Sequence, residues 1–196
     1  PSMRTGLWRK GHRKRTQQGR AEILDDKCVS CGMCMVSCPF GAISDKSQIF
    51  QLAHSLREGN KIIAIVAPAY ISQFGEDVTP RKFKTALEIL GFSDVYEVAL
   101  GADIGAISEA HHYAKEVATG NLPFLLTSCC PSWSMMAKKF FPDMIDNISQ
   151  ELTPMVATAR KVKQEHPDAK VVFVGPCASK NWRLCVPLYE AMWILS

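Results

Sequence analysis

The chain has 196 residues, and 47% of them are hydrophobic, which suits one substantial domain and a small additional module and excludes global disorder. The formal net charge of +4 is local, because residues 1–21 contain seven Lys and Arg and no acidic residue, leaving 16 basic against 19 acidic residues elsewhere. We expect residues 1–21 to be a solvated linker: Trp8 is their one aromatic side chain, so nucleic-acid binding is not expected. No apolar run is long enough for a signal peptide or a membrane helix.

Residues 22–46 contain four closely spaced cysteines. Their spacing, Cys28-x2-Cys31-x2-Cys34-x3-Cys38 followed by Pro39, matches the bacterial ferredoxin pattern and predicts a 4Fe–4S cluster. The rival, a zinc site, usually pairs two Cys-x2-Cys knuckles across a longer loop. In two-cluster ferredoxins the fourth cysteine ligates the other cluster, so Cys38 serves either this cluster or a lost companion. The second case is favoured, and the module is then incomplete.

From residue 47 onward, helical patterns alternate with short apolar strands. Helices are predicted at 47–59, 80–90, 104–119, 133–140 and 153–165, and strands at 61–67, 95–100, 124–127 and 170–174. Strands separated by helices imply right-handed crossovers. The predicted fold class is therefore α/β, with a four-stranded parallel sheet and flanking helices, preceded by the small ferredoxin-like iron–sulfur module. The predicted divisions are 1–21, 22–46, 47–180 and a tail at 181–196.

Several chemically interesting residues follow the predicted strands. Ala67 and Pro68 end the first strand, Cys129 and Cys130 follow the third, and Cys177 follows the fourth. Ligand sites of parallel sheets lie beyond the carboxyl ends of the strands, so the distant cysteines are expected at one edge. One of the adjacent cysteines can ligate metal while the other stays a free thiol; two buried structural thiols are the alternative.

These residues resemble the iron-only (FeFe) hydrogenases over about residues 20–180. TSCCPSW at 127–133 and VGPCASK at 174–180 are similar to the first two active-site signatures of that family. The resemblance implies that residues 47–180 are the first lobe of the catalytic domain. It also implies an H-cluster in the complete parent enzyme, a 4Fe–4S cluster joined to a two-iron centre, with Cys130 and Cys177 as two of its four ligands. The module would then be an electron-relay domain.

The resemblance also implies roles for single residues. Cys129 corresponds to the thiol that passes protons to the two-iron centre, and Lys180 to the lysine that binds a cyanide ligand. Ala67 and Pro68 correspond to the loop that lines the two-iron pocket. Glu109 and Ser149 correspond to members of the proton path, although a surface acid and a helix cap are equally ordinary explanations for them. His112 stands where the family has a second glutamate of that path.

The end of the chain departs from the family. The third signature, which supplies the other two H-cluster cysteines, is absent, and Cys185 is taken as incidental. The family continues with Lys-Lys-x-Glu where this chain has Asn181, Trp182 and Arg183. A back-translation with one base restored before codon 181 gives a family-like continuation. Residues 181–196 are therefore hypothesised to be an out-of-frame or truncated tail, which resequencing would test.

The expected parent activity is reversible H2 formation from protons and reduced ferredoxin, with this chain alone showing little or none. Ferredoxin or a similar carrier and the hydrogenase maturation proteins are the expected partners, and the cytoplasm is the expected compartment, because the thiols suit a reducing environment. No nucleic-acid or membrane partner is expected. The alternatives are a non-catalytic electron-transfer or sensory module and a hydrogenase-like iron–sulfur assembly protein. The presence of Cys129 and Lys180 argues against the assembly protein.

Overall fold

A computed structural model describes residues 14–15, 21–24, 26–44, 47–183 and 192–195. Most of the predicted basic linker and half of the predicted tail, including Cys185, therefore lie outside the described residues. Within the linker, the two-residue strands β1 (Lys14–Arg15) and β2 (Ala21–Glu22) pair antiparallel.

A parallel sheet forms the centre of the larger domain. Its middle strand β3 (Ile62–Val66) lies between β4 (Asp94–Glu97) and β5 (Lys170–Val174). All five residues of β3 are buried, because helices cover both faces of the sheet, and this explains the uninterrupted apolar sequence. In the tail, β6 (Met192–Leu195) pairs in parallel with β5.

The predicted four-stranded sheet is wrong in one strand. Three of the predicted strands form the sheet, but residues 124–127 do not join it. Leu126 makes only an isolated parallel bridge to Ile148, beside helices remote from the sheet. Pro123 precedes this segment and cannot donate a ladder hydrogen bond, and Phe124 is 40% exposed, so the segment lacks the buried neighbours of a central strand.

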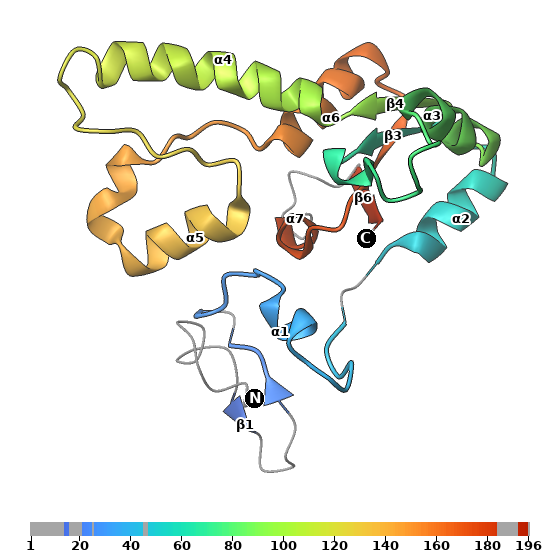
Figure 1. Cartoon of the computed structure of the whole chain (residues 1–196), viewed down its shortest axis with the longest axis horizontal. Coiled ribbons are helices and arrows are strands. Elements are labelled where there is room, and N and C mark those ends of the chain that lie inside the picture. Colours follow the sequence, from blue (N-terminus) through green and yellow to red (C-terminus); the bar gives the residue numbers. More distant parts are fainter. Residues whose placement is uncertain (1–13, 16–20, 25, 45–46, 184–191, 196) are drawn as a thin grey trace.

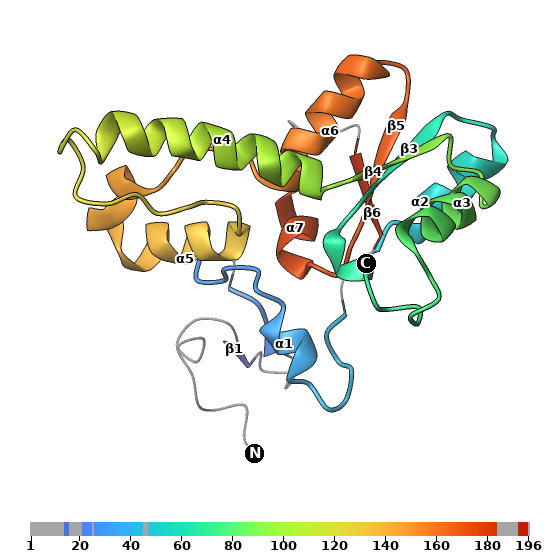
Figure 2. The same cartoon turned by 45° about the horizontal axis from the view of Figure 1, so that its top comes forward.

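Helices lie on both faces of the sheet, as Figures 1 and 2 show from two directions. One core cluster joins Ile63, Ile65 and Phe173 of the sheet to Met155 and Val162 of the helix α6. The opposite face joins other sheet residues to side chains of α2 and α3. In the described ranges the α-helices are α1 (Met33–Val36), α2 (Ile49–Arg57), α3 (Pro80–Ile89), α4 (Ala99–Glu116), α5 (Pro131–Phe140), α6 (Pro154–Glu165) and α7 (Ala178–Arg183). Two short 3-10 helices are η2 (Pro68–Tyr70) and η3 (Pro142–Asn147).

Helix α4 begins five residues earlier than predicted, at the expense of the end of the predicted strand 95–100. Gly101 explains both the error and the packing. A side chain at this position would collide with the carbonyl oxygen of Pro154 and the hydroxyl of Thr158. Glycine ordinarily weakens a helix, yet here it lets α4 cross closely over α6.

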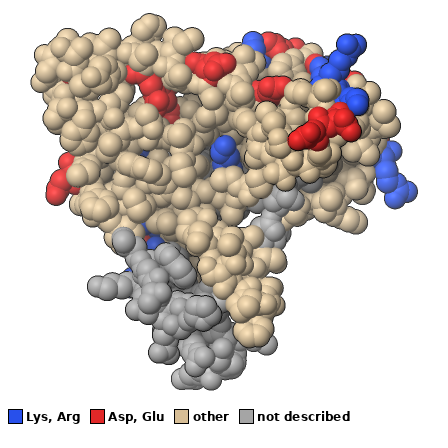
Figure 3. Space-filling view, viewed as in Figure 1, with Lys and Arg blue, Asp and Glu red and all other residues tan. Residues whose placement is uncertain are grey.

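The charged side chains are unevenly distributed. On the face shown in Figure 3 they gather mainly at the upper right, over the region of α3 and β4, where Lys84 forms an ion pair with Asp94 at 2.7 Å. The middle of that face carries few charged groups. None of the helices in the described ranges is both long and apolar enough to cross a membrane.

Candidate metal centre

The cysteine-rich module is a loop with one short helix, α1 (Met33–Val36). The chain turns sharply before this helix, because Ser30 has φ of 54° and Gly32 has φ of 76°. The backbone N–H of Ser30 donates to Cys28 Sγ at 3.3 Å, and that of Ala42 donates to Cys38 Sγ at 3.4 Å. Backbone amides directed at sulfur stabilise thiolates, so the loop has the donors that a cluster requires.

Of the four thiols Cys28, Cys31, Cys34 and Cys38, only that of Cys31 is exposed. Across the described ranges, no three Cys, His, Asp or Glu side chains lie close enough together to share one metal ion. The fit of a 4Fe–4S cluster therefore rests on the donor chemistry: four soft thiolates on one short loop, with amides directed at two sulfurs.

The module packs against the two segments that carry the other predicted ligands. Gly32 lies so close to α7 that an added Cβ would be 2.8 Å from the Cβ of Ala178, the residue after Cys177. Lys139 of α5 donates a hydrogen bond from Nζ to the carbonyl oxygen of Cys28 at 2.8 Å. Both views show the module beside α5 and α7 (Figures 1 and 2).

Cys129 and Cys130 are both exposed and directly precede α5. Cys130 occupies the N-cap position in an extended conformation, and Pro131 begins the helix, where its missing N–H costs nothing. The carbonyl oxygen of Cys130 accepts hydrogen bonds from the backbone N–H of Ser134 at 3.0 Å and from its hydroxyl at 3.1 Å. This fixes the backbone at Cys130 while leaving both thiols free to react.

Cys177 lies in the turn between β5 and α7. The edge of the sheet is tight here: the backbone N–H of Ala67 donates to the carbonyl oxygen of Val174 at 2.9 Å. A Cβ at Gly175 would be 2.8 Å from the Cβ of Ala67, so a side chain does not fit between the two loops. Helix α5 also contacts α7, so the segments after Cys130 and Cys177 are neighbours.

The other predicted pocket residues lie at the same edge. Ala67 is 7% exposed, and the exposed Pro68 begins η2. Lys180 lies one helical turn after Cys177, and its backbone N–H donates to the Cys177 carbonyl at 3.0 Å. The Lys180 ammonium lies 5.5 Å from the centre of the Phe173 ring, at the end of β5. A cation held over an aromatic ring keeps its charge near the sheet edge.

The residues of the predicted proton path are not linked to one another by hydrogen bonds within the described part of the chain. Ser149 is 1% exposed, and its hydroxyl accepts the backbone N–H of Glu151 at 3.3 Å. Glu109 is half-buried on α4, and among the residues that the structure describes its carboxylate has no hydrogen-bond or ion-pair partner. His112 is also half-buried on α4. A hydrogen-bonded route through Cys129, Glu109 and Ser149 therefore stays a prediction.

One residue near this route was missed by sequence reasoning. The Glu151 carboxylate accepts a 2.6 Å hydrogen bond from Ser108 Oγ of α4. The backbone carbonyl oxygen of Glu151 accepts a hydrogen bond from Ser128 Oγ at 3.2 Å. Glu151 thus joins α4 to the loop before Cys129 and to Ser149. A single Glu in a loop carries no pattern, so nothing in the sequence could have identified it.

Three buried hydroxyls have no hydrogen-bond partner within the described part of the chain: Ser132, Thr153 and Ser179. Ser132 follows Cys130 by two residues, and Ser179 follows Cys177 by two. Thr153 occupies the N-cap position of α6, but its side chain makes no capping hydrogen bond. Buried hydroxyls normally find a partner, so Ser132 and Ser179, each two residues after a predicted ligand, fit a site that is completed by a polar group.

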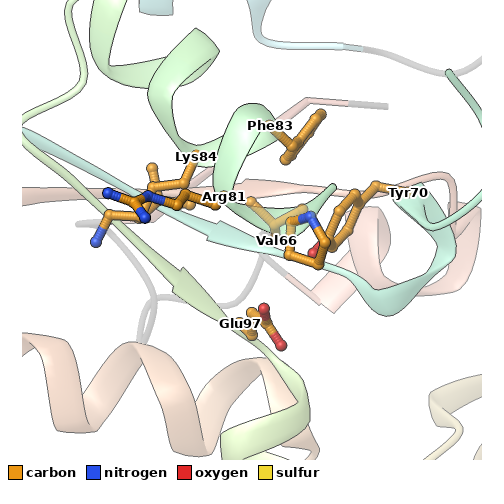
Figure 4. A pocket seen from close by; sticks show the side chains of 8 residues that line it. Val66, Tyr70, Arg81, Phe83, Lys84 and Glu97 are labelled. Carbon is orange, nitrogen blue, oxygen red and sulfur yellow. The ribbon is translucent and has the colours of Figure 1, made fainter. Parts of the chain in front are cut away.

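A cavity of about 230 Å³ lies on another part of the sheet, between the end of β3 and α3 (Figure 4). Its lining combines Val66, Tyr70 and Phe83 with Lys84 and Glu97. The rings of Tyr70 and Phe83 stack at 4.4 Å. Burial, together with the neighbouring Glu97 carboxylate, raises the pKa of the Tyr70 phenol. None of the predicted metal ligands lines this cavity.

Comparison with known proteins matches residues 60–183 to the iron only hydrogenase large subunit, C-terminal domain, and residues 21–44 to the 4Fe-4S binding domain. These matches associate the two parts with the H-cluster and with a 4Fe–4S cluster. The chain is 30% identical over 191 residues to the NADP-reducing hydrogenase subunit HndD of Solidesulfovibrio fructosivorans, covering 86% of this chain and 32% of that protein.

Two further relatives are informative. The chain is 33% identical over 170 residues to iron hydrogenase 1 of Clostridium pasteurianum, covering 78% of this chain and 29% of that protein. It is 22% identical over 180 residues to the cytosolic Fe-S cluster assembly factor NAR1 of Meyerozyma guilliermondii, covering 82% and 34%. The chain therefore spans about a third of the length of each of these three relatives.

Proposed function

The chain belongs to the iron-only hydrogenase large-subunit family, and we propose that it provides the first lobe of a hydrogenase active site together with its electron-relay module. The proposed activity of the parent enzyme is reversible H2 formation from protons and reduced ferredoxin. The observation that supports this most strongly is the packing of the module. Its Gly32 lies against Ala178, beside Cys177, and Lys139 of the helix that follows Cys130 donates to Cys28.

Six of the cysteines are the proposed ligands of the two iron–sulfur groups. Cys28, Cys31, Cys34 and Cys38 hold the module's 4Fe–4S cluster, with Cys38 as the fourth thiolate that such a cluster requires. The backbone N–H of Ala42 donates to its sulfur. Cys130 and Cys177 supply two of the H-cluster ligands. When bound, these groups carry electrons and combine them with protons. Close packing of the module on α7 shortens the path that an electron crosses.

The remaining residues shape the pocket and handle protons. The Cys129 thiol is exposed, two residues before the start of α5 at Pro131. It takes up and releases the proton, and Glu109 and Ser149 supply further groups of the path. Lys180 presents a cation to an anionic ligand at the sheet edge, and Ala67 and Pro68 line the pocket beside it.

This chain lacks the third family signature, so we propose that it does not turn over by itself. The proposed partners are ferredoxin or a similar electron carrier and the maturation proteins, in the cytoplasm. The assembly-factor function is the second candidate, because NAR1 is among the relatives. Cys129 and Lys180 favour the hydrogenase, since both are suited to a two-iron centre.

Anaerobic reconstitution of the full chain with iron and sulfide tests the proposed module. We expect about four iron and four sulfide per chain and an EPR signal after reduction, as for a 4Fe–4S cluster. Cys28→Ser should abolish the signal, whereas Cys185→Ser, the matched control, should leave it unchanged. Zinc in place of iron, or equal behaviour of the two variants, would contradict the assignment.

Maturation of the chain with the hydrogenase assembly enzymes tests the proposed H-cluster pocket. Infrared bands of CO and cyanide would report a two-iron centre held by the pocket, and their loss in Cys177→Ser would tie the centre to this site. A chain that showed no such bands and transferred its cluster to an acceptor protein would favour the assembly function. H2 evolution from the 196-residue chain would overturn the proposed lack of turnover.

A further inference from the structure

Lys139 links two parts of the chain that are 111 residues apart. Its ammonium donates a 2.8 Å hydrogen bond to the carbonyl oxygen of Cys28, the first thiol of the cluster-binding loop. The bond is made to the backbone of a proposed ligand residue, so the positive charge lies beside the loop that surrounds the cluster. The sulfur of Cys28 also accepts a hydrogen bond, from the backbone N–H of Ser30.

Helix α5 connects this contact to the other predicted metal ligands. The helix begins directly after Cys130 and extends for 10 residues, so Lys139 lies near its far end. One rigid element therefore positions a proposed H-cluster ligand at its start and fastens the module near its end. The contact between Gly32 and Ala178 provides the other point of attachment. With two attachments, the module has little freedom to rotate against the catalytic lobe.

We propose that Lys139 is a positioning residue that fastens the ferredoxin-like module to α5 and raises the reduction potential of its 4Fe–4S cluster. This inference rests on the proposed function only in that the module holds a cluster. Reduction adds one negative charge, and a fixed positive charge nearby favours the reduced state through an attraction that falls with distance and dielectric constant. Net charge near a cluster is one of the factors that set its potential.

The chain contains a matched control for this charge. Lys138 is the preceding residue of α5 and, like Lys139, is exposed. Successive residues of a helix point about 100° apart, so the two ammonium groups face different directions. Removing the Lys138 charge changes the net charge equally and leaves the hydrogen bond to Cys28 in place. The comparison therefore separates a local charge from a general one.

Redox titration of the reconstituted full chain, followed by EPR, tests the effect on potential. At the potential that half-reduces the wild-type cluster, we expect Lys139→Gln to lower the ratio of reduced to oxidised cluster about three- to tenfold, a shift of up to about 59 mV for one electron. Lys138→Gln should lower it less than twofold, and Lys139→Arg should restore most of the wild-type ratio. The difference should shrink at high salt, because the group is exposed.

Equal shifts in Lys139→Gln and Lys138→Gln, or no shift in Lys139→Gln, would overturn the electrostatic role. Hydrogen exchange of residues 26–44 in the full chain, without iron, tests the fastening independently. Exchange should be faster in Lys139→Gln than in Lys138→Gln, and equal rates would overturn that role. A wild-type chain that binds no iron would instead overturn the proposed function, so the two failures are distinguishable.

Discussion

Glu151 joins α4 to the loop before Cys129 by hydrogen bonds, so its removal should lower the free energy of unfolding. Its carboxylate and the Ser108 hydroxyl form a half-buried hydrogen bond of 2.6 Å between segments 43 residues apart. Hydrogen bonds to charged groups contribute about 1.5–3 kcal/mol, and partial exposure places this one at the lower end. We expect Glu151→Ala and Ser108→Ala each to lower the free energy of unfolding by about 1–2 kcal/mol.

The double variant separates this bond from other effects. Because both substitutions remove the same interaction, the double variant should lose hardly more than either single one, with a coupling energy of about 1–2 kcal/mol. Glu151→Gln keeps an oxygen that can accept the Ser108 proton, so it should lose less than Glu151→Ala. Urea unfolding of the full chain, monitored by circular dichroism, measures all four variants.

Glu109→Ala is the matched control, because Glu109 follows Ser108 on α4 and its carboxylate has no partner among the described residues. It should change the free energy of unfolding by less than about 0.5 kcal/mol. Strict additivity of Glu151→Ala and Ser108→Ala would refute the reasoning. So would a loss in Glu109→Ala as large as that in Glu151→Ala.

Three other predictions concern packing and pH. Gly101→Ala should destabilise the chain by about 1–3 kcal/mol in urea unfolding, because its methyl group collides with α6, whereas Gly105→Ala, with open space around its Cβ position, should stabilise it slightly. Burial of Asp94 is outweighed by hydrogen bonds from Lys84 and from the Val95 N–H, which hold the Asp94 pKa below its usual value. These hydrogen bonds stabilise the fold above the unfolded pKa near 3.8, and this stabilisation is lost as the pH falls through the folded pKa. The acid unfolding of Asp94→Asn should not show this loss, and acid-unfolding profiles that are identical for wild type and variant would contradict the prediction. The hydrogen bond from Tyr96 to Glu165, aided by burial, raises the pKa of Tyr96 to about 12, so its stabilisation is complete below pH 10.0 and is lost as the pH rises through about 12. Ultraviolet titration should show a phenol that ionises near pH 12 and is missing in Tyr96→Phe.

Much of the larger domain could be predicted because its sequence patterns are local. The unbroken apolar runs of β3 and β5 identify strands buried on both faces, and the helices predicted from 80 and 153 begin at Pro80 and Pro154 in the structure. Helix α5 begins at Pro131, two residues before the predicted start at 133. The start of α4 escaped prediction because Gly101 serves a contact with α6, and tertiary contacts are not encoded in local propensity.

The site residues were proposed from motifs, and their roles stay predictions. The cysteine spacing indicates a cluster. The shared edge expected for Cys130 and Cys177 relied on a strand at 124–127, and that segment is not part of the sheet. Ser108 with Glu151, and Lys139 with Cys28, are pairs separated by 43 and 111 residues. Single Ser, Glu and Lys residues are common on surfaces, so no pattern distinguishes these from the rest.

The central claim is that the sulfurs of Cys130 and Cys177, from separate stretches of the chain, lie close together where α5 meets α7. Anaerobic cross-linking of the full chain with a short bifunctional thiol reagent, followed by peptide mass spectrometry, measures this directly. The account predicts a cross-link that joins Cys130 to Cys177. Cross-links confined to residues 28–38 and to the adjacent pair at 129 and 130, with none reaching Cys177, would contradict it.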